Sequence, residues 1–294
     1  MLSILIPTYN YNVYPLVEKL HNEAMALGID FEINIYDDHS PNPFPENEKI
    51  NHLSNSNYVR LEKNIGRSAI RNKLATESVY NNLLFLDADV IPENSNFLAQ
   101  FISNIAPEND LIIGGIVYEN KIPEEKYRLR WKYGKNREYR SVIDRKRNPY
   151  LSIISASFLI KKKVFLKTNL YLKKAYGIDV LFANNLQKGK YKILHINNPV
   201  IHLGLETNMQ FVEKTKRGLE TLSLLSQEKK IPQDYRPLQK KYIQLKKNGL
   251  IIFVQFFIKH TENFILKNLD SSNPSLFLFD VYRLYYYSKI VKNA

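Results

Sequence analysis

The chain has 294 residues, of which 44% are hydrophobic and 24% are charged, a balance typical of a globular protein and not of a disordered one. It contains no cysteine, which excludes a disulfide framework, a thiolate zinc site and a cysteine nucleophile. The formal net charge of +13 favours a polyanionic partner, such as a nucleic acid, an anionic membrane or a phosphorylated substrate.

Short apolar strands alternate with amphipathic helices along the first part of the chain. Hydrophobic spacing predicts strands at residues 2–6, 31–36, 58–61, 82–86 and 111–117, with helices at residues 13–27, 67–80 and 98–105. This alternation predicts an α/β fold with a mainly parallel sheet flanked by helices. Loops at the carboxyl ends of such strands meet in one crevice, where site residues are expected.

The remainder of the chain is less regular. Residues 126–147 hold ten basic and two acidic side chains, for which a solvated helix face or a loop is one interpretation and contact with a polyanionic partner is the other. The sequence then predicts an apolar segment at residues 152–160, a helix at 179–186 and short β segments at 191–195 and 199–203. After Gly204 the pattern becomes helical and lysine-rich, so we expect residues 205–294 to form a helical C-terminal extension.

Two segments bear on location. The N-terminal residues lack a basic stretch, and their apolar run ends at Pro7, so they do not resemble a secretory signal and a cytoplasmic chain is expected. The apolar run at residues 250–258 is too short to cross a bilayer. The terminal residues 276–290 mix aromatic with basic side chains, which fits either an interfacial helix on the inner, anionic face of the cell membrane or a helix packed on the core.

A carboxylate pair follows the strand at residues 82–86. Asp87 and Asp89 flank Ala88, and two such oxygen donors suit Mg²⁺ or Mn²⁺ bound together with a substrate phosphate. Alone, this pattern also fits a polar loop or a helix N-cap. A phosphatase nucleophile would normally open its fold, whereas two strand-helix units precede Asp87 here, which counts against a phosphatase.

Six segments keep a recognisable order and spacing over about residues 1–204. They are ILIPTYN (4–10), INIYDDHSP (33–41), NIGRSAIRN (64–72), LLFLDADVIP (83–92), ISASFLIKKKVF (154–165) and YGIDVLFANNLQKGKYKI (176–193). In these segments the chain resembles the GT-A fold, Rossmann-like glycosyltransferases of the large inverting family 2. The resemblance implies a glycosyltransferase domain over residues 1–204, with a nucleotide-sugar-binding half at 1–115 and an acceptor-binding half at 116–204.

The resemblance also implies how the donor is bound. Pro7, Thr8 and Tyr9 would lie against the nucleobase, with Tyr9 stacking and Thr8 hydrogen bonding. Asp38 would accept a hydrogen bond from the base imide, which favours uracil or thymine over cytosine, while Asp37 would brace the loop.

The resemblance implies that basic side chains and a divalent ion bind the donor's diphosphate. Arg71, assisted by Arg67 one helical turn away, would approach the base and diphosphate. Asp89 would bind Mn²⁺ or Mg²⁺ directly, with Asp87 on the ribose or on metal-bound water and Ala88 between them. His202 matches a histidine that some relatives use near the metal, and a core histidine is the alternative.

Asp179 is the only carboxylate between Asp144 and Glu206. The resemblance implies that it is the catalytic base, which takes a proton from the acceptor hydroxyl. Relatives usually have Glu-Asp here, whereas this chain has Ile178 before the aspartate. A helix N-cap is the structural alternative for Asp179, and both roles can coexist.

The expected function is therefore transfer of a sugar from a nucleotide sugar, of the UDP or dTDP type, to a glycan or lipid-linked acceptor, as in bacterial polysaccharide biosynthesis. One alternative is a nucleotidyltransferase with the same fold. Another is a basic nucleic-acid-binding protein, which no recognised motif supports, so no nucleic acid is expected as a partner. The sequence contains no GxxxxGK[ST], strand-linked GxGxxG or HExxH pattern.

Overall fold

The computed structural model describes residues 1–170 and 174–292, so the last two residues of the expected C-terminal extension lie outside the described part. The chain divides into two compact units. The sheet unit comprises Met1–Glu119, Glu138–Lys174 and Phe182–Gly204, and the helical unit comprises Asn120–Arg137, Ala175–Leu181 and Leu205–Ala294. The domain limits expected at residues 115 and 204 stay predictions.

A seven-stranded sheet forms the centre of the sheet unit, as far as its residues are described. Its order is β3 (Ser56–Arg60), β2 (Phe31–Asp37), β1 (Leu2–Thr8), β4 (Asn82–Leu86), β8 (Ser157–Lys161), β6 (Leu111–Ile113) and β9 (Ile193–His195). Strand β8 runs antiparallel to its neighbours β4 and β6, and the other neighbouring pairs are parallel. The predicted α/β fold class, with a mainly parallel sheet, is confirmed.

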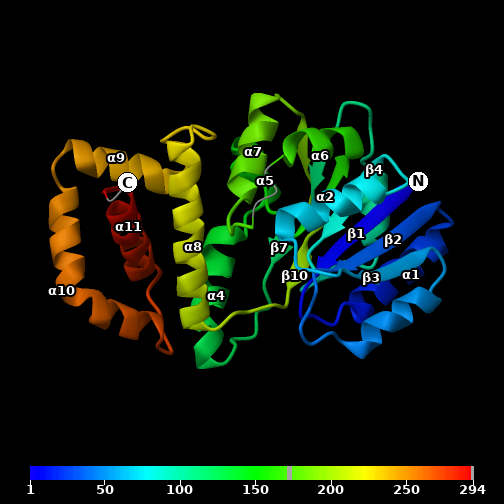
Figure 1. Ribbon diagram of the computed structural model, residues 1–294, viewed down its shortest axis with the longest axis horizontal. Coiled ribbons are helices and arrows are strands. Elements are labelled where there is room, and N and C mark those ends of the chain that lie inside the picture. The colour runs from blue at the N-terminus through cyan, green and yellow to red at the C-terminus, as the bar shows by residue number, and fades with distance from the viewer. Residues whose placement is uncertain (171–173, 293–294) are drawn as a thin grey trace. The chain divides into compact units, whose positions relative to one another are not determined.

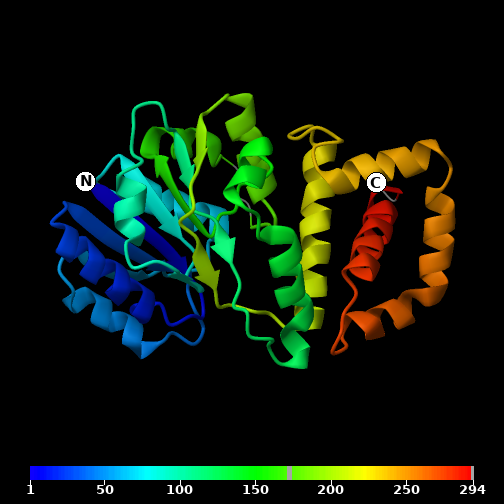
Figure 2. The ribbon, with the colours of Figure 1, turned by 180° about the vertical axis from the view of Figure 1, so that it is seen from behind.

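Helices cover both faces of this sheet, because successive apolar residues of a strand point to opposite faces. Leu5, Leu83 and Phe85 pack in one core with α2 (Arg67–Glu77), α6 (Lys162–Thr168) and α7 (Asp179–Lys188). Ile4, Ile6 and Leu84 alternate with them and are fully buried. The 3-10 helix η1 (Pro45–His52) contacts α1 (Tyr14–Leu27), which itself contacts β2 and α3 (Phe97–Ile102). The reverse view shows α1 alongside the first strands (Figure 2).

The β-rich run at residues 111–117 forms two strands rather than one, because the chain turns at two glycines. A Cβ on Gly114 would lie 2.2 Å from the carbonyl oxygen of Asn198, and Gly115 has a φ of +109°. After the turn, β7 (Ile116–Val117) joins a second sheet with the order β5 (Val90–Pro92), β10 (Val200–His202), β7. This small sheet brings residue 202 next to the loop that follows β4.

The basic stretch at residues 126–147 contains short helices rather than a loop. They are η2 (Glu125–Tyr127), α4 (Arg128–Tyr133), the π-helical turn η3 (Gly134–Glu138) and α5 (Val142–Arg147). Helix α4 belongs to the helical unit and α5 to the sheet unit.

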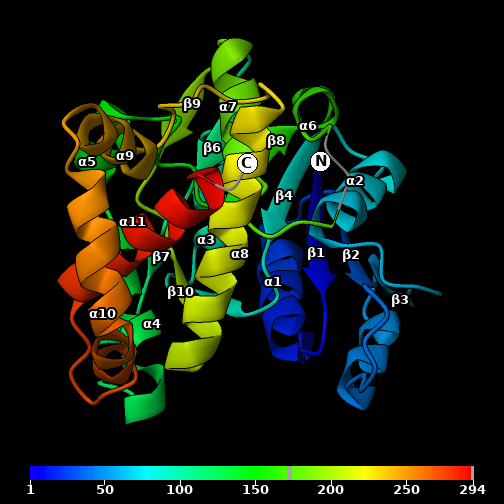
Figure 3. The same cartoon turned by 60° about the vertical axis from the view of Figure 1, so that its left-hand side comes forward.

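Four longer helices build the helical unit: α8 (Asn208–Gln227), α9 (Pro237–Lys247), α10 (Ile251–Leu269) and α11 (Leu276–Lys292). Helix α11 lies between α8 and α10 (Figures 1 and 3) and contacts both. Its Phe279, Tyr282 and Tyr285 are at most 4% exposed and pack with Phe211 of α8 and Ile258 of α10. Of the two interpretations of the terminal segment, packing on a core is therefore the one observed.

Among the described helices, none is by itself long and apolar enough to cross a membrane. Helices α9 and α10 meet that requirement only as a pair, and this pair is bent by 110°.

Candidate functional site

Three loops meet at one edge of the main sheet. Strand β1 pairs in parallel with both β2 and β4, so the carboxyl ends of all three strands lie at the same edge. The backbone N–H of Asp38 donates to the carbonyl of Thr8 over 2.9 Å, which joins the first two loops directly.

The loop after β1 offers one accessible aromatic ring. Thr8 is buried, and its hydroxyl donates to the carbonyl of Tyr11 at 3.4 Å. Asn10 adopts a φ of 50°, and its N–H donates to Ser40 Oγ at 2.7 Å. Tyr9, following Pro7 and Thr8, is 51% exposed, so its ring is open to stacking.

Asp37 braces the loop that follows β2. Its carboxylate accepts hydrogen bonds from the N–H of Ser40 at 2.7 Å and from the hydroxyl of Tyr58 at 2.8 Å. Burial and the bond to Asp37 both raise the pKa of Tyr58 above its ordinary value. This tyrosine therefore stays a hydrogen-bond donor at neutral pH.

Asp38 fixes the loop that leads into α2. Its two carboxylate oxygens accept the N–H groups of Ile65 at 2.6 Å and Gly66 at 2.8 Å, which fixes the loop leading into α2. Each oxygen has a second lone pair, so contact with a nucleobase remains chemically open and stays a prediction.

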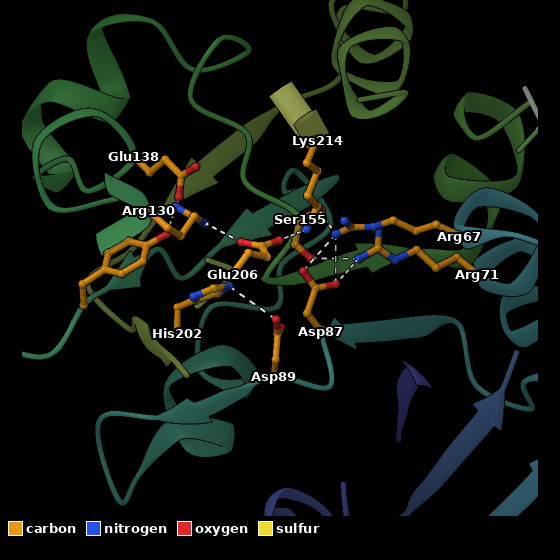
Figure 4. A network of polar contacts seen from close by, with 11 residues as sticks. Arg67, Arg71, Asp87, Asp89, Arg130, Glu138, Ser155, His202, Glu206 and Lys214 are labelled. Carbon is orange, nitrogen blue, oxygen red and sulfur yellow. Dashed lines mark hydrogen bonds and ion pairs between the residues drawn. The ribbon is translucent and has the colours of Figure 1, made fainter. Parts of the chain in front are cut away.

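Two arginines hold Asp87 (Figure 4). Arg67 Nη2 lies 2.9 Å from Asp87 Oδ2 and 2.9 Å from Ser155 Oγ. Arg71, which is 4% exposed, pairs with Asp87 Oδ1 and donates to the carbonyl of Ser155 at 3.2 Å. The sequence predicted that both arginines lie near the diphosphate, and the structure joins them to Asp87.

Ser155 was missed by sequence reasoning. It precedes β8, whose first residues lie beside the end of β4 because the two strands are antiparallel. The N–H of Asp87 donates to the carbonyl of Ala156 at 3.0 Å, which fixes this proximity. The only sequence signal was the position of Ser155 in one of the six family-like segments.

Asp89 faces His202 within the sheet unit (Figure 4). Strand β10 pairs antiparallel with β5 so that His202 is opposite Val90, and the N–H of Leu203 donates to the carbonyl of Asp89 at 2.8 Å. This register places His202 Nε2 3.4 Å from Asp89 Oδ2. Two predicted metal ligands that are far apart in the sequence are thus brought together.

The electrostatic environment keeps Asp89 charged. Burial acts to raise the pKa of its carboxyl, but the hydrogen bond with His202 and the electrostatic interactions with His202 and Arg67 outweigh burial. The pKa of Asp89 therefore lies below its ordinary value, and the group is a carboxylate at neutral pH.

Gly204 leaves room beside this carboxylate. A Cβ on Gly204 would lie 2.1 Å from Asp89 Oδ2, so any other residue would force Asp89 to move. This role of Gly204 was not predicted from the sequence, where the residue marks only the start of the helical extension. The available signal was a glycine two residues after His202.

The Asp89–His202 pair fits a divalent cation that is shared with a ligand. No group of three or more metal-ligating side chains occurs among residues 1–170 and 174–292, and Asp87, expected as a further ligand, is held by the arginines. One carboxylate oxygen and one imidazole nitrogen leave most positions of Mg²⁺ or Mn²⁺ open to water and phosphate oxygens. In the described part of the chain, the buried Nδ1 of His202 has no hydrogen-bond partner.

Asp179 belongs to the helical unit, whereas all the other predicted site residues belong to the sheet unit. It is the first residue of α7 and is partly buried. Its negative charge acts on Arg236: burial lowers the pKa of this arginine below its ordinary value, and Tyr235, Tyr133 and Asp179 oppose that shift. The role of Asp179 as a base stays a prediction.

A close backbone approach fixes the turn before Asp179. Gly177 has a φ of +83°, and a Cβ there would lie 3.2 Å from the Cα of Gly218 in α8. Lys214 of α8 lies over the Tyr176 ring, 5.1 Å from its centroid. These contacts hold the Asp179 segment against α8.

Part of the basic stretch is neutralised within the helical unit (Figure 4). Glu206 pairs with Lys214 and accepts a hydrogen bond from Arg130 Nε at 3.2 Å. Burial acts to raise the pKa of Glu206, but these two cations outweigh it and lower the pKa. Arg130, only 8% exposed, is therefore a structural residue and not part of a solvated face.

The model of the protein family described as glycosyl transferase family 2 matches residues 3–168. The chain belongs to this family. Its expected enzyme class, a glycosyltransferase, is confirmed by family 2 membership, and no curated protein matches the chain in sequence.

Several solved structures resemble this family 2 chain. Glucosyl-3-phosphoglycerate synthase from Mycobacterium tuberculosis, solved with Mg²⁺ and UDP, superposes with a TM-score of 0.53 at 14% identity over 80% of this chain and 81% of that one. Mannosyl-3-phosphoglycerate synthase from Rubrobacter xylanophilus gives 0.54 at 15% identity over 81% and 77%. TarS residues 1–349 from S. aureus, solved with UDP-GlcNAc, gives 0.50 at 14% identity over 99% and 90%. These similarities show a shared GT-A-like fold.

Proposed function

We propose that this family 2 protein is a metal-dependent, inverting glycosyltransferase, which moves a sugar from a nucleoside diphosphate sugar to a hydroxyl of a glycan or lipid-linked acceptor. The observation that carries the proposal is the Asp89–His202 pair, 3.4 Å apart at the strand edge of a family 2 domain. It combines an ionised carboxylate and an imidazole in the same unit as the loops that would bind a nucleotide.

We place the base of a UDP or dTDP donor against the loops after β1 and β2. The exposed ring of Tyr9 is available for stacking, and Asp38 retains lone pairs for an imide N–H. Thr8 and Pro7 would shape this contact. The UDP and UDP-GlcNAc bound in two structurally similar proteins support a uridine donor.

Asp89 and His202 would hold Mn²⁺ or Mg²⁺. The Mg²⁺ that accompanies UDP in the mycobacterial synthase supports this choice of ion. Such an ion neutralises the charge that develops on a departing diphosphate. Asp87 would contact the ribose or metal-bound water, with Ala88 beside it. Arg67 and Arg71, already joined to Asp87, would add positive charge near the diphosphate.

Asp179 would act as the base. It would accept the proton of the acceptor hydroxyl while that oxygen bonds to the anomeric carbon, and the bond from this carbon to the diphosphate oxygen would break on the opposite side. The sugar configuration is therefore inverted. The charge of Asp179 interacts with Arg236, and Ile178 stands where relatives usually have a glutamate.

The acceptor would be a growing surface glycan of polysaccharide biosynthesis, carried by a lipid at the inner face of the cell membrane. The support is charge: residues 205–294 hold fifteen basic and eight acidic side chains, and such surfaces are attracted to anionic lipid headgroups. This would make the enzyme a cytoplasmic, peripheral membrane protein.

Thermal unfolding with a panel of nucleotide sugars, with and without Mn²⁺, tests the donor, because a ligand that binds the folded state raises the melting temperature. We expect the largest shift with a UDP- or dTDP-sugar plus Mn²⁺, and UDP or dTDP as the product of turnover. Absence of any shift would contradict the proposal, and release of pyrophosphate from a nucleoside triphosphate would favour a nucleotidyltransferase.

The variant Asp179→Asn tests the base. The donor-induced shift should persist while transfer falls by about 10²- to 10⁴-fold. Asp234→Asn, which removes an exposed carboxylate of the helical unit, is the matched control and should keep full activity. Near-normal transfer by Asp179→Asn would remove this residue from the mechanism.

A further inference from the structure

Helix α10 is apolar on two opposite faces. Its inner face, formed by Ile251, Ile258, Ile265 and Leu269, is at most 8% exposed and contributes to the core of the helical unit. Its outer face carries five large apolar side chains that are 64–71% exposed: Ile252, Phe253, Phe256, Phe257 and Phe264. Exposed apolar side chains are normally scattered singly over a surface, so the presence of five on one side of α10 requires an explanation.

These five residues project from the outer side of the helix, and we call them the α10 aromatic face. Residues 252 and 256, and residues 253 and 257, are one turn apart, and residue 264 follows two turns after 257 on the same side. Helix α11 contacts α10 from the opposite side, and α9 contacts it near its start (Figures 1 and 3). Several large exposed apolar side chains gathered on one side of a helix mark an interaction site.

Positive charge borders the α10 aromatic face. Between Asp234 and Glu262 the sequence has no acidic residue and six basic ones. Lys246 and Lys247 are exposed at the end of α9, and Lys259 is exposed on α10 itself. Exposed phenylalanines flanked by lysines are the composition of helices that lie in the interface of an anionic bilayer.

We propose that the α10 aromatic face binds the surface of an anionic lipid bilayer, with its phenylalanines inserted among the acyl chains and the neighbouring lysines on lipid phosphates. A second copy of the chain fits this face less well. A symmetric contact would bring the same lysines of both copies together without an intervening acidic residue from residues 235–261. An anionic bilayer instead neutralises them, and each lysine near its surface strengthens binding by about fivefold.

The inference deepens the membrane contact proposed above and rests on it for the cellular role. It assigns the membrane contact to α10, which presents apolar surface, and not to the terminal helix α11, which is packed in a core. The measurement below needs no sugar transfer. Failure of vesicle binding and failure of the proposed enzymatic activity are therefore distinguishable.

Co-sedimentation of the full chain with vesicles tests the proposal. We expect binding to phosphatidylcholine vesicles that contain about one quarter phosphatidylglycerol, and little binding to pure phosphatidylcholine. The triple variant Phe253→Gln/Phe256→Gln/Phe257→Gln should bind at least about a hundredfold more weakly, given the free energy of transferring phenylalanine from water. Val79→Gln, which changes a side chain that is 76% exposed in the sheet unit, is the matched control and should bind normally.

The contribution of the lysines to vesicle binding has a separate test. Lys246→Gln/Lys247→Gln should weaken binding by about 10- to 30-fold and reduce its dependence on salt. The melting temperature of each variant, compared with the original chain, confirms folding. Absence of binding by the original chain, or unchanged binding by the triple variant, would overturn the proposal. So would a dimer in light scattering that the triple variant converts to a monomer while no vesicle is bound.

Discussion

The expected donor site in the sheet unit and helix α10 in the helical unit differ in what they bury and what they expose. In the sheet unit, Arg71, Arg145 and Asp38 are 3–6% exposed, and each is held by hydrogen bonds to fixed partners. In the helical unit, Phe253 and Phe256 are about 70% exposed. Buried charge needs positioned partners, whereas clustered exposed apolar surface needs an external one, so these charges are satisfied within the sheet unit while the α10 aromatic face is available for contact.

Arg145 illustrates the internal organisation. Its guanidinium donates to the carbonyls of Ile113 at 3.2 Å, Gly114 at 3.2 Å and Ile196 at 2.8 Å, and to His195 Nδ1 at 3.3 Å. It thereby ties β6 to the segment after β9. Burial lowers the pKa of Arg145 below its ordinary value, and the guanidinium remains charged at neutral pH.

The largest expected effect is the loss of transfer activity when Asp89, and not a carboxylate outside the site, is neutralised. Asp89→Asn should lower transfer by about 10³-fold or more, because loss of a metal-held charge costs several kcal/mol in the transition state. It should also abolish the Mn²⁺-dependent part of the donor-induced thermal shift. Steady-state rates over a Mn²⁺ titration measure the first effect. Asp30→Asn, at an exposed position of the sheet unit, serves as the control, and an unchanged Mn²⁺ dependence in Asp89→Asn would exclude Asp89 as a ligand.

The buried polar groups of the sheet unit should make its stability sensitive to acid. Burial lowers the pKa of His195 to about 4, with Arg145 and Lys146 acting in the same direction and a bond to the carbonyl of Pro149 opposing them. Between pH 6.5 and 4 the unfolded chain therefore binds a proton that the folded chain does not, so stability falls as pH falls. This histidine accounts for a loss of about 3 kcal/mol.

The matched variant for this measurement is His195→Gln, whose amide can donate to Pro149 and accept from Arg145. Free energies of unfolding in urea at pH 7 and pH 4 give the comparison. The original chain should lose about 3 kcal/mol more than the variant over this range. An equal loss in both proteins would contradict the prediction, because it would mean that the folded and unfolded chains protonate His195 over the same pH range.

A smaller effect tests the space beside Asp89. Gly204→Ala would put a Cβ 2.1 Å from Asp89 Oδ2, so the carboxylate must rotate or the loop must shift. We expect about a tenfold loss in kcat/KM, because moving the Asp89 carboxylate would misplace the metal ion and the donor. The variant should also require more Mn²⁺. Leu203→Ala, at a residue that is 44% exposed, should leave both values unchanged, and full activity of Gly204→Ala would contradict the role of this glycine.

The sheet unit could largely be predicted from the sequence because its signals are local. Residues 82–86 form β4 as expected, and residues 2–6 and 31–36 form all but the ends of β1 and β2. The spacing of Arg67 and Arg71 correctly put them on one helix. The sequence could not show that both reach Asp87, because that depends on how α2 packs on the sheet. The register of β10, which brings His202 to Asp89, is likewise a long-range property.

The helical unit was less predictable for a physical reason. Residues 276–290 and 250–258 are both rich in aromatic and aliphatic side chains, so composition does not reveal which one lies inside. The structure packs Phe279 and Tyr285 between helices and leaves Phe256 outside. The order in which α8, α11 and α10 stack decides this, and no local pattern encodes that order.

The smallest expected effect on stability concerns the α10 aromatic face. Phe256→Gln should change the free energy of unfolding by no more than about 0.5 kcal/mol in the absence of lipid, because its side chain is 67% exposed. Phe279→Ala, at a residue 1% exposed, should cost about 3–5 kcal/mol. Urea unfolding measures both.

A large loss for Phe256→Gln would mean that this phenylalanine is covered in the folded chain. The contrast between the buried charges of the sheet unit and the exposed apolar side chains of α10 would then fail. A near-zero change has the opposite meaning: the fold does not need Phe256, and the side chain is then available to an external apolar phase at no cost to the protein's own stability.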